Sequence, residues 1–124
     1  MKSMLLSIGG IYCFALAVFH VFFWKLFRWR QDLHRLTATN RAIMQILNLR
    51  LIYVFIIFGV MSLVFREDLL GTSIGRFIVI AISLFWFGRA IEQVIFFGLR
   101  RPISVAFFVT FLVGCTIFAL PIFI

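Results

Sequence analysis

Charged and amide side chains able to bind a ligand lie within apolar segments of this chain. Arg89, Glu92 and Gln93 occur in the third of four apolar runs, and Asn48 and Arg50 occur in the second. A charge in hydrocarbon is costly and persists where it is paired, hydrated or functional. Arginine donors attract an anion, a carboxylate or a lipid headgroup, and a nearby glutamate positions them. These residue types therefore indicate a site that binds a small polar or anionic species.

The spacing of Arg89, Glu92 and Gln93 places all three on one face of a helix, because residues three and four apart are neighbours there. Two interpretations follow. In the first, Arg89 and Glu92 neutralise each other and hold the helices together. In the second, at least one of them lines a functional pocket.

Arg50 and His20 each allow two interpretations. Arg50 lies about five residues inside the second apolar core, so its side chain either reaches the membrane surface or turns towards Glu92. His20 is either hydrogen-bonded to Asn48 or Glu92, or a protonatable group that gates the pocket. A haem site is unsupported, because His34 lies outside the apolar runs and cannot provide a second axial ligand.

Composition identifies the class of protein. Of 124 residues, 65% are hydrophobic and 13% are charged, which is typical of a polytopic membrane protein and not of a soluble domain. The net charge of +8 is explained by cations that flank apolar segments, so nucleic-acid binding is not expected. Cys13 and Cys115 occur singly, without metal or redox spacing. No catalytic set, metal site or cofactor is predicted, and an enzyme is the less favoured class.

The expected fold is all-α, a single transmembrane domain over 1–124 with four membrane-spanning helices. The spans are predicted at about 4–24, 42–65, 77–99 and 103–124. The first helix is expected to continue through 25–33, and Thr39 or Asn40 to cap the second. Pro102 follows two arginines and suits the first turn of the fourth helix. Gly9, Gly10 and other small residues are expected to let helices approach closely.

Cations flanking the spans predict the orientation. Seven fall in the 25–41 connection and the 100–101 turn, whereas three fall on the other side. The positive-inside rule then places both termini outside and both basic connections in the cytoplasm. In this orientation the polar side chains within the spans all fall in the cytoplasmic half of the membrane. Five cations of the longer connection are expected to attract anionic lipid headgroups: Lys25, Arg28, Arg30, Arg35 and Arg41.

The segments 19–25, 40–48 and 89–93 resemble those of small, uncharacterised four-helix bacterial integral membrane proteins. These segments read FHVFFWK, NRAIMQILN and RAIEQ. The resemblance implies an inner (cytoplasmic) membrane location and no particular activity.

Three functional hypotheses result. The first is a cytoplasm-facing intramembrane pocket that binds or passes a small polar or anionic species. The second is an accessory or scaffolding subunit whose polar residues join helices. The third is a small membrane enzyme or cofactor carrier. In the second span, Arg41 and Arg50 lie on opposite faces, which favours a homo-oligomer or a partner subunit.

The predicted orientation is tested with a fluorescent protein that matures in the cytoplasm. A fusion after Leu36 should fluoresce, whereas a fusion after Ile124 should stay dark. Fluorescence from the Ile124 fusion would reverse the assignment of the termini.

Overall fold

The computed structural model describes residues 1–124 and consists of helices joined by short connections. The helices are α1 (Lys2–Val21), α2 (Phe23–Leu26), α3 (Trp29–Asp32), the 3₁₀ turn η1 (Leu33–Arg35), α4 (Ala38–Val64), α5 (Arg66–Gly71), α6 (Ser73–Phe97) and α7 (Pro102–Phe123). Helices α1, α4, α6 and α7 are the four that are long and apolar enough to cross a membrane. This confirms the all-α prediction of a four-helix membrane bundle.

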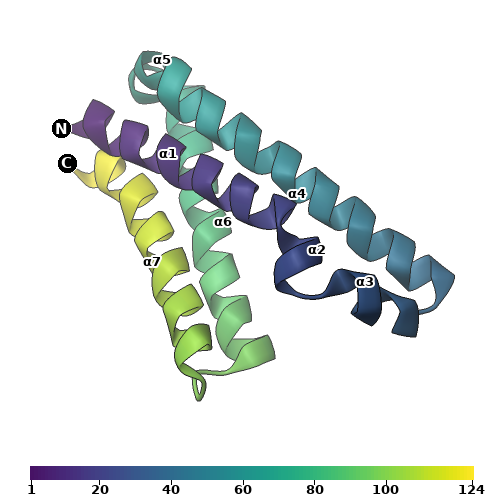
Figure 1. Ribbon diagram of the computed structural model, residues 1–124. Helices are drawn as coiled ribbons and strands as arrows, with labels where there is room; N and C mark the ends of the chain where they lie inside the picture. The colour runs from purple at the N-terminus through teal and green to yellow at the C-terminus, as the bar shows by residue number, and fades with distance from the viewer.

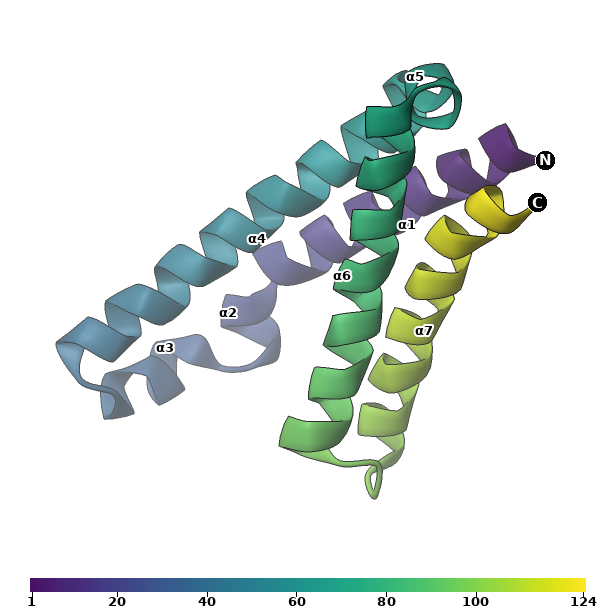
Figure 2. The ribbon, with the colours of Figure 1, turned by 180° about the vertical axis from the view of Figure 1, so that it is seen from behind.

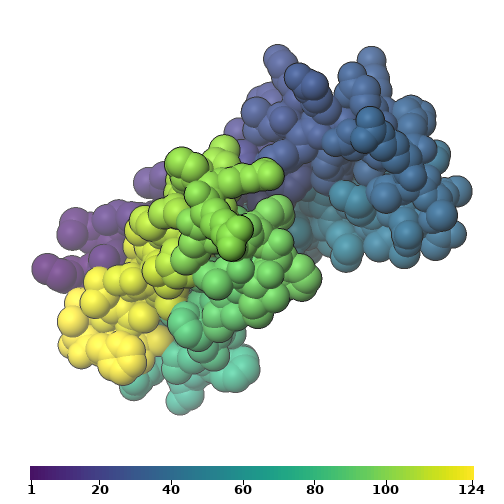
Figure 3. Space-filling model, turned by 90° about the horizontal axis from the view of Figure 1, so that it is seen from below, coloured from purple at the N-terminus to yellow at the C-terminus, as the bar shows by residue number.

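The four long helices form two antiparallel pairs, α1 with α4 and α6 with α7 (Figure 1). Helix α1 also packs against α7, which joins the pairs near the two chain termini. Away from the termini the pairs diverge, and the view from behind shows the same wedge (Figure 2). Both basic connections lie at this diverging end. From below, the α6–α7 lobe lies beside the lobe that contains α2, α3 and the start of α4 (Figure 3).

Aromatic side chains hold the two pairs together where the wedge closes. The Trp86 ring of α6 stacks on Phe55 of α4 at 5.2 Å between centroids and on Phe111 of α7 at 6.1 Å. Tyr12 of α1 meets the same indole edge-on at 5.2 Å, and its hydroxyl donates to the Thr110 carbonyl of α7 at 2.7 Å. Trp86, which is 1% exposed, therefore contacts all three other long helices.

Small residues bring the helices close together near the chain termini, as expected from the sequence. A Cβ at Gly10 would lie 2.6 Å from Leu63 Cγ and 3.1 Å from the Gly59 carbonyl of α4. A Cβ at Gly9 would lie 2.6 Å from the buried Phe118 ring of α7. Glycine at these positions lets α1 lie in contact with both α4 and α7.

The prediction that the first helix continues through 25–33 is wrong. Helix α1 ends at Val21, and the chain turns at Arg28, whose φ of 52° is left-handed. The segment then folds back as α3 and η1. Arg41 of α4 secures the end of η1 by donating from Nε to the Leu33 carbonyl at 3.0 Å and from a terminal nitrogen to the Leu36 carbonyl at 3.2 Å.

The start of α4 also differs from expectation. Thr37 is the capping residue, and its hydroxyl accepts from the Asn40 backbone N–H at 3.2 Å, so neither Thr39 nor Asn40 caps the helix. At the other end of α4, the expected connection contains the short helix α5. The predicted role of Pro102 at the start of α7 is confirmed.

Two glycines of α6 provide a matched test of packing. A Cβ at Gly75 would lie 2.3 Å from the Asp68 backbone oxygen and 2.5 Å from Leu69 Cα, whereas a Cβ at Gly88 would meet nothing within 4 Å. Gly75→Ala should lower the free energy of unfolding by about 1–3 kcal/mol. Gly88→Ala should leave it unchanged or raise it by up to about 1 kcal/mol. Denaturation in mixed micelles measures both, and equal effects would contradict the close α5–α6 packing.

Candidate functional site

A cavity of about 830 Å³ occupies the wedge between the two helix pairs. Sixteen of its 22 lining residues are hydrophobic, so it is an apolar space with a few polar groups. Phenylalanine and tryptophan dominate the lining, and the polar or charged members are His20, Asp32, Arg89, Gln93, Arg101 and Ser104. A volume of this size is typical of small-molecule sites.

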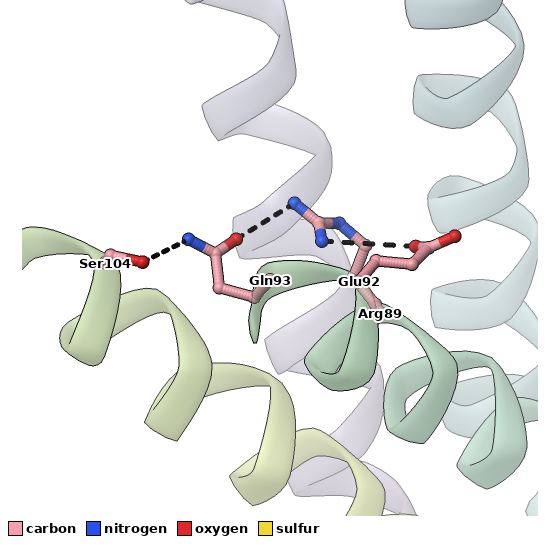
Figure 4. Close-up of polar contacts among 4 residues, drawn as sticks. All are labelled: Arg89, Glu92, Gln93 and Ser104. Atoms are coloured by element: carbon pink, nitrogen blue, oxygen red, sulfur yellow. Dashed lines mark hydrogen bonds and ion pairs between the residues drawn. The ribbon is translucent and has the colours of Figure 1, made fainter. Parts of the chain in front are cut away.

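Arg89 is the charged residue placed deepest in this wall. It lies eight residues before the end of α6, about 12 Å along the helix. Its guanidinium carbon lies 4.5 Å from the centroid of the Phe111 ring of α7, a cation–π contact. One terminal nitrogen donates to Gln93 Oε1 at 3.2 Å (Figure 4). The aromatic face and the amide hold the guanidinium in one orientation.

Glu92 neutralises Arg89 weakly. Its carboxylate oxygen lies 4.0 Å from an Arg89 terminal nitrogen, beyond hydrogen-bonding distance, and its side chain is 58% exposed. In Figure 4 the Glu92 carboxylate extends to the side of α6 opposite Ser104. An exposed pair of this kind contributes little stability. Glu92 therefore lies outside the cavity, and the guanidinium keeps most of its hydrogen-bonding capacity.

Gln93 links α6 to α7. Its side-chain nitrogen donates to Ser104 Oγ at 2.9 Å, and the Ser104 hydroxyl donates in turn to the Gly98 carbonyl. Gln93 and Ser104 are both buried. The amide thus has two partners of opposite kind, Arg89 on its oxygen and Ser104 on its nitrogen, which fixes its orientation.

His20 forms the opposite wall of the cavity, from the end of α1. Its Nδ1 lies 2.8 Å from the Leu16 carbonyl, which can only accept, so Nδ1 carries the proton of this bond. The ring stacks on Phe23 at 4.3 Å and meets Phe55 edge-on at 5.0 Å. This leaves Nε2 without a protein partner on a half-buried ring.

The remaining predicted residues do not line the cavity. Asn48 is buried and donates from its side-chain nitrogen to the His20 carbonyl at 3.1 Å, which joins α4 to α1. Arg50 is exposed, with its guanidinium 5.7 Å from the Tyr53 ring of its own helix. The structure therefore brings Arg89, Gln93 and His20 into the cavity lining, and it leaves Asn48, Arg50 and Glu92 outside that lining. Neither side chain that the sequence offered as a His20 partner, Asn48 or Glu92, bonds to its ring.

Asp32 and Arg101 are lining residues that the sequence did not single out. Both are exposed and line the cavity from the two basic connections. In the sequence analysis their charges were used only to predict the membrane orientation. Asp32 enters the lining because the chain reverses at Arg28, and no sequence pattern indicated that reversal.

The groups that line the cavity can recognise a ligand. The structure holds no group of three His, Cys, Asp or Glu side chains placed to bind a metal ion. Cys13 and Cys115 are both free thiols. What the cavity offers is a fixed guanidinium, an imidazole nitrogen and aromatic walls. These groups can bind an anion that carries apolar surface.

No protein-family model matches the chain, and no curated protein or solved structure matches it either. The resemblance to small four-helix bacterial membrane proteins accordingly stays an expectation.

The Gln93–Ser104 bond can be tested by its effect on stability. Ser104→Ala should lower the free energy of unfolding by about 0.5–2 kcal/mol, because it leaves the buried Gln93 amide without an acceptor. Thr116→Ala is the matched control on α7, since its exposed hydroxyl bonds only to the Leu112 carbonyl of the same helix. Thermal unfolding in micelles distinguishes the two, and equal midpoints would contradict a structural role for the bond.

Proposed function

We propose that this multi-pass membrane protein binds, or passes, a small anionic species in the cavity between its helix pairs, with Arg89 as the principal anion-binding group. The observation that carries the proposal is the state of the Arg89 guanidinium. It is fixed in the cavity wall, and its single carboxylate neighbour lies 4.0 Å away and mostly exposed.

The hydrogen-bond inventory supports this assignment. A guanidinium has five N–H donors, and one hydrogen bond to Gln93 accounts for a single donor. Three other polar residues within the spans bond across helices: Asn48 to α1, Gln93 to α7, and Ser83 to the Cys115 carbonyl of α7. Arg89 makes no hydrogen bond to another helix. Interhelical hydrogen bonding therefore accounts for the presence of these three residues within the spans, and it does not account for the presence of Arg89.

The proposed location is the inner (cytoplasmic) membrane, with the cavity facing the cytoplasm. Both basic connections lie at the diverging end of the wedge, and Asp32 and Arg101 of these connections line the cavity. Lys25, Arg28, Arg30 and Arg35 are exposed at that end and would attract anionic lipid headgroups. In this orientation a ligand reaches Arg89 from the cytoplasmic leaflet.

A second candidate function is that of an accessory subunit within a membrane complex. Arg50 on α4 and Glu92 on α6 are charged, exposed and outside the cavity. Charges that face lipid are costly, and opposite charges on two helices suit pairing with a second copy or a partner subunit. This candidate concerns a different surface and is compatible with ligand binding in the cavity.

Binding is tested by calorimetry on protein in discs of zwitterionic lipid, titrated with a panel of small carboxylates and phosphate esters. Arg89→Gln should weaken binding at least about tenfold, because it removes a charge-assisted donor while keeping a polar, uncharged side chain. Arg89→Lys should be intermediate, since lysine keeps the charge and loses the planar donor set.

Arg50→Gln is the matched control. It removes one positive charge from an exposed site outside the cavity. Affinity in this variant should stay within about twofold of the unmodified protein, because exposed charges are screened. Equal weakening by Arg50→Gln and Arg89→Gln would show general attraction to positive charge and would contradict a site at Arg89.

A further inference from the structure

We infer that the ligand is a single-chain amphiphilic monoanion: one carboxylate or phosphate-type group on one apolar body. The inference rests on the proposed function and specifies the ligand class of the same cavity. It follows from the cavity's volume, the chemistry of its walls and its net charge.

The volume exceeds what a small anion fills. At about 30 Å³ per non-hydrogen atom, 830 Å³ accommodates about 28 such atoms, whereas acetate has about four. A bare anion would leave the aromatic walls facing water, which is unfavourable at roughly 25 cal/mol per Å². An apolar body that covers these walls supplies the remaining binding free energy.

The same volume sets an upper limit. A two-chain phospholipid has about 50 non-hydrogen atoms, nearly twice the number that fits at the density above. A bilayer phospholipid would therefore extend well beyond this volume. A single chain or a compact aromatic body fits within the limit.

The charges in the lining select a monoanion. Arg89 and Arg101 contribute two positive charges and Asp32 contributes one negative charge, so the net formal charge is one positive. Asp32 and Arg101 are exposed and opposite in charge, so the charge left to balance in the apolar part of the cavity is that of Arg89. One anionic group at Arg89 restores neutrality there, where an unbalanced charge is costly. A dianion at Arg89 would leave one negative charge unbalanced among the aromatic walls, and a cation would meet repulsion at Arg89.

The aromatic contacts orient the ligand. Arg89 lies against Phe111, whose ring stacks on Trp86 at the closed end of the wedge. Aromatic contacts between α4 and α6 are made at this level, where Phe55 packs on Trp86 and Phe58 on Phe85. Nearer the basic connections the wall includes Phe27, Phe96 and Phe97. The anionic group is therefore placed deep, and the apolar body lies between Arg89 and the connections.

The experiment measures binding of radiolabelled dodecanoate to protein in discs of zwitterionic lipid, with empty discs subtracted. Competition by acetate, octanoate, dodecanol and dodecyltrimethylammonium is then measured. We expect saturable dodecanoate binding, with octanoate weaker by at least about tenfold, since each buried methylene contributes about 0.8 kcal/mol. Dodecanol and the cationic amphiphile should compete at least about tenfold less well than unlabelled dodecanoate.

The outcomes separate this inference from the proposed function. If acetate competes as well as dodecanoate, an anion site exists and the amphiphile inference is overturned. If dodecanol competes as well as dodecanoate, the charge is irrelevant and both proposals fall. Absence of saturable binding by any anion overturns both. If phosphatidylglycerol added to the discs displaces dodecanoate, the occupant is a bilayer phospholipid. This result overturns the inference that the ligand has a single chain.

A cavity-filling variant provides an independent check. Met44 of α4 lines the cavity, so Met44→Trp should reduce dodecanoate affinity at least about fivefold by occupying the space of the apolar body. Met4→Trp, at an exposed position near the start of α1, is the control and should leave affinity unchanged. Arg89→Gln should remove saturable binding while Gly88→Ala retains it. Equal affinity in the Met44 and Met4 variants would place the apolar body elsewhere and overturn the inference.

Discussion

The cost of keeping one guanidinium within an apolar bundle is the constraint on which this structure depends. An arginine at the centre of a membrane helix costs about 2.5–3.5 kcal/mol even on the most permissive scale. The protein offsets part of this cost with an aromatic face at Phe111 and an amide at Gln93. It leaves the offset incomplete, because the nearby Glu92 carboxylate is mostly exposed and does not line the cavity. The divergence of the two helix pairs creates a cavity, and the remaining N–H donors of Arg89 lie at its wall.

Two groups of polar side chains within the spans have different physical roles. Asn48, Ser83 and Gln93 each bond to a neighbouring helix. Such bonds stabilise helix association in membranes, where the driving force for burial is weak. Arg89 and His20 instead keep unused nitrogen atoms at the cavity wall. Gln93 connects the two groups, because its side-chain amide joins α6 to α7 through Ser104 and also orients Arg89.

Most of the fold could be predicted from the sequence, and only part of the site could. Hydropathy located four spans to within a few residues, because an apolar helix of spanning length leaves a strong local signal. The reversal after α1 could not be predicted, since it depends on a left-handed Arg28 and on Arg41 bonding to carbonyls of η1. Helical spacing placed Arg89, Glu92 and Gln93 within one broad sector. It could not show that Glu92 lies at the edge of that sector and turns outwards, because the direction of a long side chain depends on the neighbouring helices. Arg101 and Asp32 were missed because residues far apart in sequence line one cavity only in the folded chain.

The most direct test of the central claim is whether the Arg89 guanidinium is in contact with a hydrated cavity in a lipid bilayer. Solid-state NMR with magnetisation transferred from mobile water to arginine side-chain nitrogens measures this, with the Arg89 signal assigned by its loss in Arg89→Gln. We expect transfer to Arg89 at a rate close to that of the exposed Arg28, and a lower rate when dodecanoate fills the cavity. A dry Arg89 signal in the absence of ligand, unchanged by dodecanoate, would show a structural ion pair and contradict the assignment of a binding site.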